Sequence, residues 1–98
     1  MMIVELSVVP VGTSETSVSS YVRAALRVFA EADLDYKVNS MGTCVEGEWD
    51  EIFSALKTVH DRLAGMGCHR IVTTVKIDDR RDKRGTMAAK VAAVTEGS

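Results

Sequence analysis

The chain has 98 residues, 46% of them hydrophobic and 27% charged, with a formal net charge of -2 at pH 7. We expect one domain over residues 1–98, whose small core favours a homodimer or tetramer with shared buried surface. Acids are interleaved with bases, no apolar run approaches the roughly 20 residues that cross a bilayer, and no targeting pattern precedes the first strand, so we expect a cytoplasmic protein with neither nucleic acid nor membrane as partner.

The first half of the chain predicts a strand, a helix and a hairpin. Residues 3–11 are rich in β-branched side chains and end in turn-forming residues. A helix follows, with Ser17 as its cap and apolar residues at helical spacing. Residues 35–40 and 43–47 then alternate as two strands, and Met41 and Gly42 can form the turn between them.

The second half predicts a helix, a strand and a terminal helix. Residues 49–66 carry an apolar stripe at helical spacing, with acidic side chains in the first turn and glycines at the end. Residues 70–78 read as a strand. Residues 86–94 could form a short alanine-rich helix with so little apolar area that it needs a partner surface.

The resulting order, βαββαβ, predicts an α+β ferredoxin-like sandwich: a four-stranded antiparallel sheet of order 4-1-3-2, two helices on one face and a short C-terminal helix. Strand alternation then sorts the side chains into two faces. The face toward the helices should carry Val4, Leu6, Val8, Val38, Val45, Ile71, Val75 and Ile77. The open face should carry Glu5, Ser7, Val9, Lys37, Asn39, Cys44, Glu46, Val72, Thr74 and Lys76.

The polar segment 41–47 is the first candidate for a binding site. The predicted strand order makes the first and third strands neighbours, which we expect to place Thr43 beside Pro10 and Glu46 opposite Ser7. The first helix begins at the same end of the sheet and brings Ser17, Ser20 and Tyr21 toward the turn. A pocket is therefore expected between the turn, the strand and the start of the helix.

Each of these polar residues also has an ordinary structural role. Glu46 can pair with Lys37 across the hairpin, and Glu5 can pair with Lys76 on the fourth strand. Ser17 fits a helix cap better than a ligand contact, and Tyr21 fits the edge of the core.

The charged run 76–84 is the second polar feature. Its acids and bases lie close enough to compensate each other, which favours a solvated face or ion pairs between subunits over phosphate binding. It leaves the sheet on the edge opposite Thr43. Asp78 and Arg80 would therefore reach the pocket only from a second subunit.

No catalytic or metal-binding pattern accompanies these segments. Neither histidine has a cysteine or serine at a recognisable spacing, and no glycine-rich phosphate loop occurs. Cys44 and Cys68 are too few and too far apart for a zinc site or a redox pair, and both fit small core residues. We therefore expect no enzyme, no metal and no cofactor.

Four segments together resemble the small thiamine-binding proteins of the MTH1187/YkoF-like type. They are VVPVGT at 8–13, SVSSYV at 17–22, MGTCVEG at 41–47 and RIVTTVKIDDRRDK at 70–83. The resemblance implies a ferredoxin-like fold, dimers that join their sheets and often pair into tetramers, and binding of thiamine or its hydroxymethylpyrimidine part without turnover.

An aminopyrimidine offers ring-nitrogen acceptors and an amine donor, which a hydroxyl and a carboxylate can match. The expected ligand-binding residues are Thr43 and Glu46, with Ser7, Ser20 and Asn39 as further polar contacts and Met41 against the ring. Thr43 should face the helices and Glu46 the open side, so one ligand meets both only at a twisted hairpin end or with a partner subunit. Two alternatives are a structural or regulatory homo-oligomer and an enzyme with Glu46 as general base.

Overall fold

The computed structural model describes residues 1–12 and 19–96. The elements are β1 (Met2–Pro10), α1 (Ser19–Glu31), β2 (Asp35–Asn39), β3 (Gly42–Gly47), α2 (Trp49–Gly65), β4 (Ile71–Asp79) and α3 (Met87–Thr95). This is the predicted order of elements, with a terminal helix after the fourth strand. The predicted cap Ser17 lies outside the described residues.

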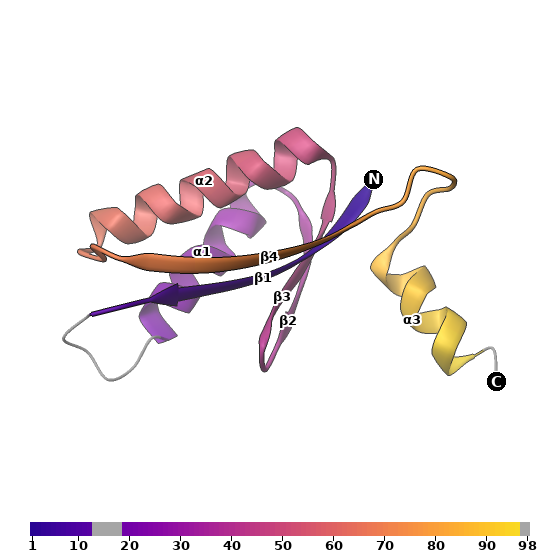
Figure 1. The fold of residues 1–98 in the computed structure, drawn as a ribbon, viewed down its shortest axis with the longest axis horizontal. Helices are drawn as coiled ribbons and strands as arrows, with labels where there is room; N and C mark the ends of the chain where they lie inside the picture. The colour runs from indigo at the N-terminus through magenta and orange to yellow at the C-terminus, as the bar shows by residue number, and fades with distance from the viewer. Residues whose placement is uncertain (13–18, 97–98) are drawn as a thin grey trace.

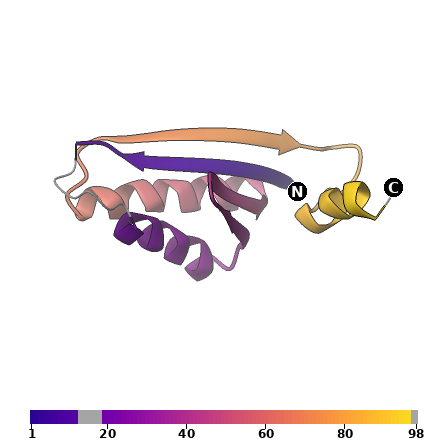
Figure 2. The same ribbon diagram turned by 90° about the horizontal axis from the view of Figure 1, so that it is seen from below.

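The strands form one antiparallel sheet in the order β2-β3-β1-β4, which is the predicted order 4-1-3-2 counted from the other edge. Figures 1 and 2 show α1 and α2 together on one face of this sheet. The ferredoxin-like α+β fold is therefore confirmed. Its central strand β1 has β3 on one side and β4 on the other.

The core lies between the sheet and these two helices. Every second residue of β1 is buried from Met2 to Leu6, as alternation requires, and Val45 of β3 is fully buried beside them. The helices contribute Val28, Phe29, Ile52, Ala55, Val59 and Leu63. Cys68 is buried in this core as predicted, whereas Cys44 is half-buried and accepts a hydrogen bond from Asn39 Nδ2 at 3.6 Å.

The register between β1 and β3 differs from the prediction. Leu6 lies opposite Thr43 and Ile3 lies opposite Glu46, so the expected pairs, Thr43 beside Pro10 and Glu46 opposite Ser7, are wrong. The pairing of β3 with β1 stops at Leu6, in the middle of β1, before the hairpin turns at Ser40 and Met41. Because the shift is an even number of residues, each side chain stays on its predicted face.

Of the two other predicted cross-strand pairs, one is confirmed and one is wrong. Glu5 does lie opposite Lys76 in the register of β1 with β4. Glu46 lies opposite Asp35 rather than Lys37, whose neighbour on β3 is Cys44. The predicted Glu46–Lys37 pair is therefore wrong, because Gly42 already belongs to β3 and the turn falls one residue earlier than expected.

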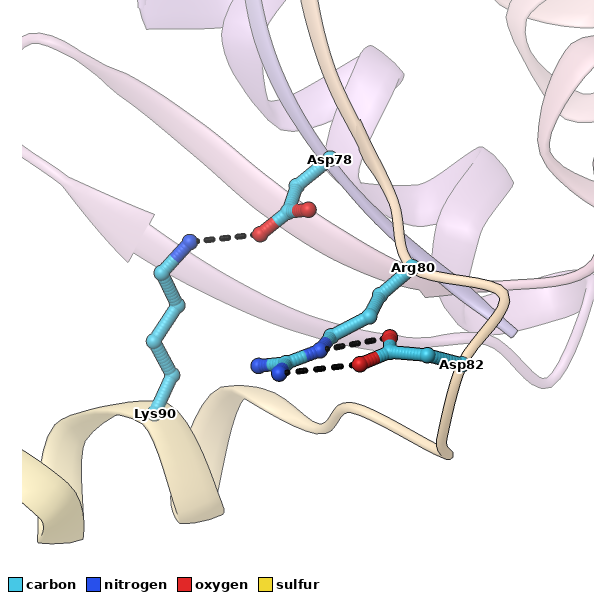
Figure 3. Close-up of polar contacts among 4 residues, drawn as sticks. All are labelled: Asp78, Arg80, Asp82 and Lys90. Atoms are coloured by element: carbon cyan, nitrogen blue, oxygen red, sulfur yellow. Dashed lines mark hydrogen bonds and ion pairs between the residues drawn. The ribbon is translucent and has the colours of Figure 1, made fainter.

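The terminal helix α3 lies beyond the end of the sheet at which β1 begins (Figures 1 and 2). Its N-terminus is held by Glu46, whose Oε2 accepts a hydrogen bond from the backbone N of Met87 at 2.7 Å. One turn later, Lys90 Nζ pairs with Asp78 Oδ2 at 2.6 Å (Figure 3). No described residue of α3 is buried, so polar contacts rather than apolar packing attach this helix.

The connection into α3 is shaped by a second ion pair. Arg80 donates from Nε and Nη2 to the two carboxylate oxygens of Asp82, at 2.8 and 3.2 Å (Figure 3). Thr86 then caps α3, accepting a hydrogen bond from Ala89 N at 3.1 Å. The loop after β4 is thus folded by its own charges.

Gly42 tests the close approach of β1 and β3. A Cβ on Gly42 would lie 2.8 Å from the backbone oxygen of Leu6, so we expect Gly42→Ala to force the strands apart. Such overpacking costs about 1–3 kcal/mol. Urea unfolding should show that loss as a lower midpoint.

The matched control is Gly65→Ala. No atom lies within 4 Å of a Cβ placed on Gly65, in the last turn of α2. The free energy of unfolding should stay level or rise by up to about 1 kcal/mol, because alanine loses less entropy than glycine in a helix. Equal midpoints for both variants would mean that the Gly42 contact does not constrain the sheet.

Glu46→Ala should loosen α3 and leave the rest of the domain intact. The variant removes the carboxylate that holds the helix N-terminus, which we expect to weaken α3 locally by about 1 kcal/mol. Hydrogen exchange should show faster amide exchange across α3 without a change in the urea midpoint. Glu5→Ala, an exposed carboxylate in the same sheet, is the control, and equal exchange in the two variants would contradict this role of Glu46.

Candidate functional site

A cavity of about 220 Å³ lies between the β2–β3 hairpin, α1 and the second half of β1. We call it the hairpin cavity. The cavity exists because β1 extends beyond the end of its pairing with β3. β3 pairs with β1 only as far as Leu6, and the described residues of β1 beyond that point pair with β4 alone. The space beside the free side of β1 is closed by the hairpin tip and by α1.

The polar part of the wall comes from the strands and the turn. Ser7 of β1, Asn39 of β2 and Thr43 of β3 all line the hairpin cavity. Alternation turns the side chains of Ser7 and Asn39 to the open face, where Asn39 Nδ2 donates to Cys44 Sγ, so Thr43 alone of the three faces the helices. Met41 lines it from the turn, with 88% of its surface exposed. The fold therefore brings together four residues that the sequence proposed as ligand contacts.

The other two proposed residues lie elsewhere. Glu46 is on the open face of the sheet, where it binds Met87, and it contributes to a separate hollow of about 450 Å³ beside α3. Ser20 is half-buried in the first turn of α1 and is not among the described residues that line the hairpin cavity. The predicted split of Thr43 and Glu46 onto opposite faces is confirmed by the register.

Residues of α1 make much of the apolar wall, and of these the sequence placed only Tyr21 near the expected pocket. Tyr21 is buried, and the cavity is also lined by Val22, Ala25, Leu26 and Phe29. Their spacing of three and four residues puts them on one side of the helix. That spacing was visible in the sequence, but it does not tell a cavity wall from a packed surface.

None of the described residues that line the hairpin cavity carries a charge. Hydroxyl and amide groups can both donate and accept hydrogen bonds, so the wall can match a neutral polar molecule. A bare ion would lose its hydration without gaining a counter-charge there. The arrangement thus favours a small, flat, uncharged group with polar edges.

The groups that serve acid–base or metal chemistry are placed outside this cavity. His60 Nε2 lies 2.7 Å from Thr73 Oγ1, between α2 and β4. Among residues 1–12 and 19–96, no group of three or more His, Cys, Asp or Glu could hold a metal ion. No helix in the same part of the chain is long and apolar enough to span a membrane.

The sequence of the chain is similar to those of a known protein family. The family model described as "Thiamine-binding protein" matches residues 4–95. A UPF0045 protein of Methanothermobacter thermautotrophicus is 42% identical over 97 residues, covering 98% of each chain. The UPF0045 protein YqgV of Bacillus subtilis is 34% identical over 100 residues, covering 98% of this chain and 96% of its own.

Solved structures agree with the sequence comparison. The hypothetical protein MJ1052 of Methanocaldococcus jannaschii matches with a TM-score of 0.87 and 40% identity, over 97% of this chain and 96% of that chain. A Thermotoga maritima protein, provisionally assigned to thiamine biosynthesis or salvage, has a TM-score of 0.79 and 25% identity, over 95% and 97% of the two chains. Since the family model and these relatives span nearly all of the chain, it belongs to the thiamine-binding protein family.

Proposed function

We propose that this protein binds thiamine through its aminopyrimidine ring in the hairpin cavity and does not turn it over. The observation that carries the proposal is an uncharged cavity of single-ring size whose wall joins hydroxyl groups to apolar side chains. Family membership and the provisional assignment of the Thermotoga maritima neighbour to thiamine biosynthesis or salvage support the ligand class.

The volume of the cavity sets the part of the ligand that can enter. Pockets for drug-sized ligands are usually about 300–1,000 Å³, and this one is about 220 Å³. One six-membered ring with small substituents suits that space better than the whole two-ring molecule. The remainder of thiamine would therefore extend toward the hairpin tip, where Met41 is exposed.

The charge of the wall decides which ring that is. The thiazolium ring is a cation and would be desolvated without a counter-charge among the described lining residues. The aminopyrimidine ring is neutral, and its nitrogens and amine can pair with the hydroxyl of Thr43, which faces the helices. Tyr21 and Phe29 supply aromatic surface, which suits a flat heterocycle.

Calorimetric titration of the wild type and of Thr43→Val tests this proposal. Valine keeps the shape of threonine and removes one hydroxyl, so we expect thiamine binding to weaken roughly tenfold, the value of one hydrogen bond of about 1.4 kcal/mol. The hydroxymethylpyrimidine fragment should retain most of the affinity of thiamine. The thiazole fragment alone should produce no binding heat.

The matched control is Thr74→Val, an exposed threonine on β4 that does not line the cavity. It should leave the affinity unchanged. Glu46→Gln should also leave the affinity unchanged. The sequence proposed Glu46 as a ligand contact, but the fold turns it toward α3. Absence of saturable binding to thiamine or to the pyrimidine fragment would sink the proposal, and an unchanged affinity in Thr43→Val would move the site elsewhere.

We also propose that copies of this chain associate through α3. The supporting observation is that Val91 and Val94 are 51% and 77% exposed on a helix without a buried residue. Exposed valines on so weakly attached a helix favour a second copy as cover. Association would also agree with the small core of each chain.

Sedimentation velocity on the full chain tests the association. The wild type should sediment above monomer mass, and Val91→Ser with Val94→Ser should shift it toward the monomer. Ala88→Ser with Ala93→Ser is the control, because both alanines are exposed on the same helix and lose little apolar area. A wild type of monomer mass would contradict the proposal.

A further inference from the structure

A second cavity, of about 680 Å³, lies at the other end of β1 from the hairpin cavity. Its walls come from the start of β1, from Glu48 and Trp49 at the start of α2, and from the loop that follows β4. The two cavities share no described lining residue. The second cavity is therefore a separate place on the molecule from the hairpin cavity.

Internal ion pairs use up the carboxylates around this cavity. Arg81 Nη2 lies 2.9 Å from Asp79 Oδ2, and Arg80 pairs with Asp82. The amino group of Met1 lies 3.5 Å from Glu48 Oε1. In each pair a carboxylate already has a cationic partner within its own chain.

Two cations in the cavity wall are left over. Lys83 and Arg84 both line the cavity, and neither has an ion pair with another described residue. The chain as a whole has a formal net charge of -2, so this positive excess is local. Arg81 and Arg80, whose side chains are 80% and 48% exposed, add guanidinium groups that can donate further hydrogen bonds.

Of the two paired arginines at this site, Arg81 is held in position by Asp79. Arg81 donates to Asp79 from Nε at 3.0 Å, and this contact lowers the pKa of the Asp79 carboxyl, assisted by a hydrogen bond from Trp49. The ionised carboxylate thus ties the guanidinium to the end of β4. Less side-chain entropy is then lost when Arg81 meets a ligand.

An aromatic side chain borders the same cations. Trp49 stacks on Phe53 with ring centroids 5.2 Å apart, and it remains 44% exposed. The indole lines the cavity together with Lys83 and Arg84. Guanidinium and ammonium groups recognise phosphate oxygens, and an indole offers a flat surface to a heterocycle.

We propose that this cavity binds a small phosphate-bearing anion with at least two negative charges, such as a diphosphate group. Lys83 and Arg84 supply the uncompensated charge, Arg81 supplies an oriented guanidinium, and Trp49 borders any organic portion of the ligand. An ion-pair network between subunits, favoured from the sequence alone, would need the acids of this loop. Those acids are already paired within the chain.

The protein carries its own reporter, because Trp49 is the single tryptophan of the chain. Its fluorescence should change saturably when inorganic pyrophosphate is added at constant ionic strength. Lys83→Gln with Arg84→Gln should raise the dissociation constant at least about tenfold, since two charge-assisted contacts are lost. An adenine nucleotide is the second probe. If it binds more tightly than pyrophosphate, the site takes an organic phosphate, and if pyrophosphate binds more tightly, the site takes an inorganic one.

The control is Arg27→Gln with Arg70→Gln, which removes the same charge from exposed positions outside this cavity. It should bind pyrophosphate like the wild type, and both double variants should keep thiamine binding and the thermal midpoint. No saturable change in wild-type fluorescence overturns the proposal. Equal affinity in the two double variants also overturns it, and so does a lowered sedimentation mass in Lys83→Gln with Arg84→Gln without loss of pyrophosphate affinity.

Discussion

The pairing of β1 with β3 is the constraint on which the rest of the molecule depends. It begins at Met2 opposite Gly47 and ends at Leu6 opposite Thr43, where Gly42 comes too close to Leu6 for any side chain. From Ser7 to Pro10, β1 pairs with β4 alone, so an opening remains next to α1. A longer hairpin would fill that opening with strand, and the fold would lose its cavity.

The same pairing explains which parts of the structure were predictable. Faces follow from alternation within one strand, so the positions of Thr43 toward the helices and Glu46 toward the open side were set by local pattern. Register depends on where the hairpin turns relative to a distant strand, and that is a long-range property. The prediction placed Thr43 beside Pro10, yet it kept the correct faces because the error was an even number of residues.

Residues of the candidate site divide along the same line. Asn39, Met41 and Thr43 could be proposed because they lie in or beside a turn that stands out in sequence, whereas Ser7 was proposed from an expected pairing with Glu46 that the register contradicts. The wall from α1 could not, since Val22 and Leu26 have the spacing of any buried helix face. Glu46 was proposed because a carboxylate suits a ligand, but a helix N-terminus attracts a carboxylate equally well, and Met87 lies 2.7 Å from it.

The two ends of β1 thus offer opposite environments to solutes. At one end, strands of unequal length leave a neutral cavity that can hold a flat heterocycle but would desolvate a charge at a cost. At the other, a loop of alternating acids and bases folds on itself, and the pairing of its acids leaves cations facing a larger hollow. Compensation of charge in the sequence therefore does not imply compensation in space: the acids of residues 78–82 are used in ordering the loop and holding α3, and the charge of Lys83 and Arg84 remains for a ligand.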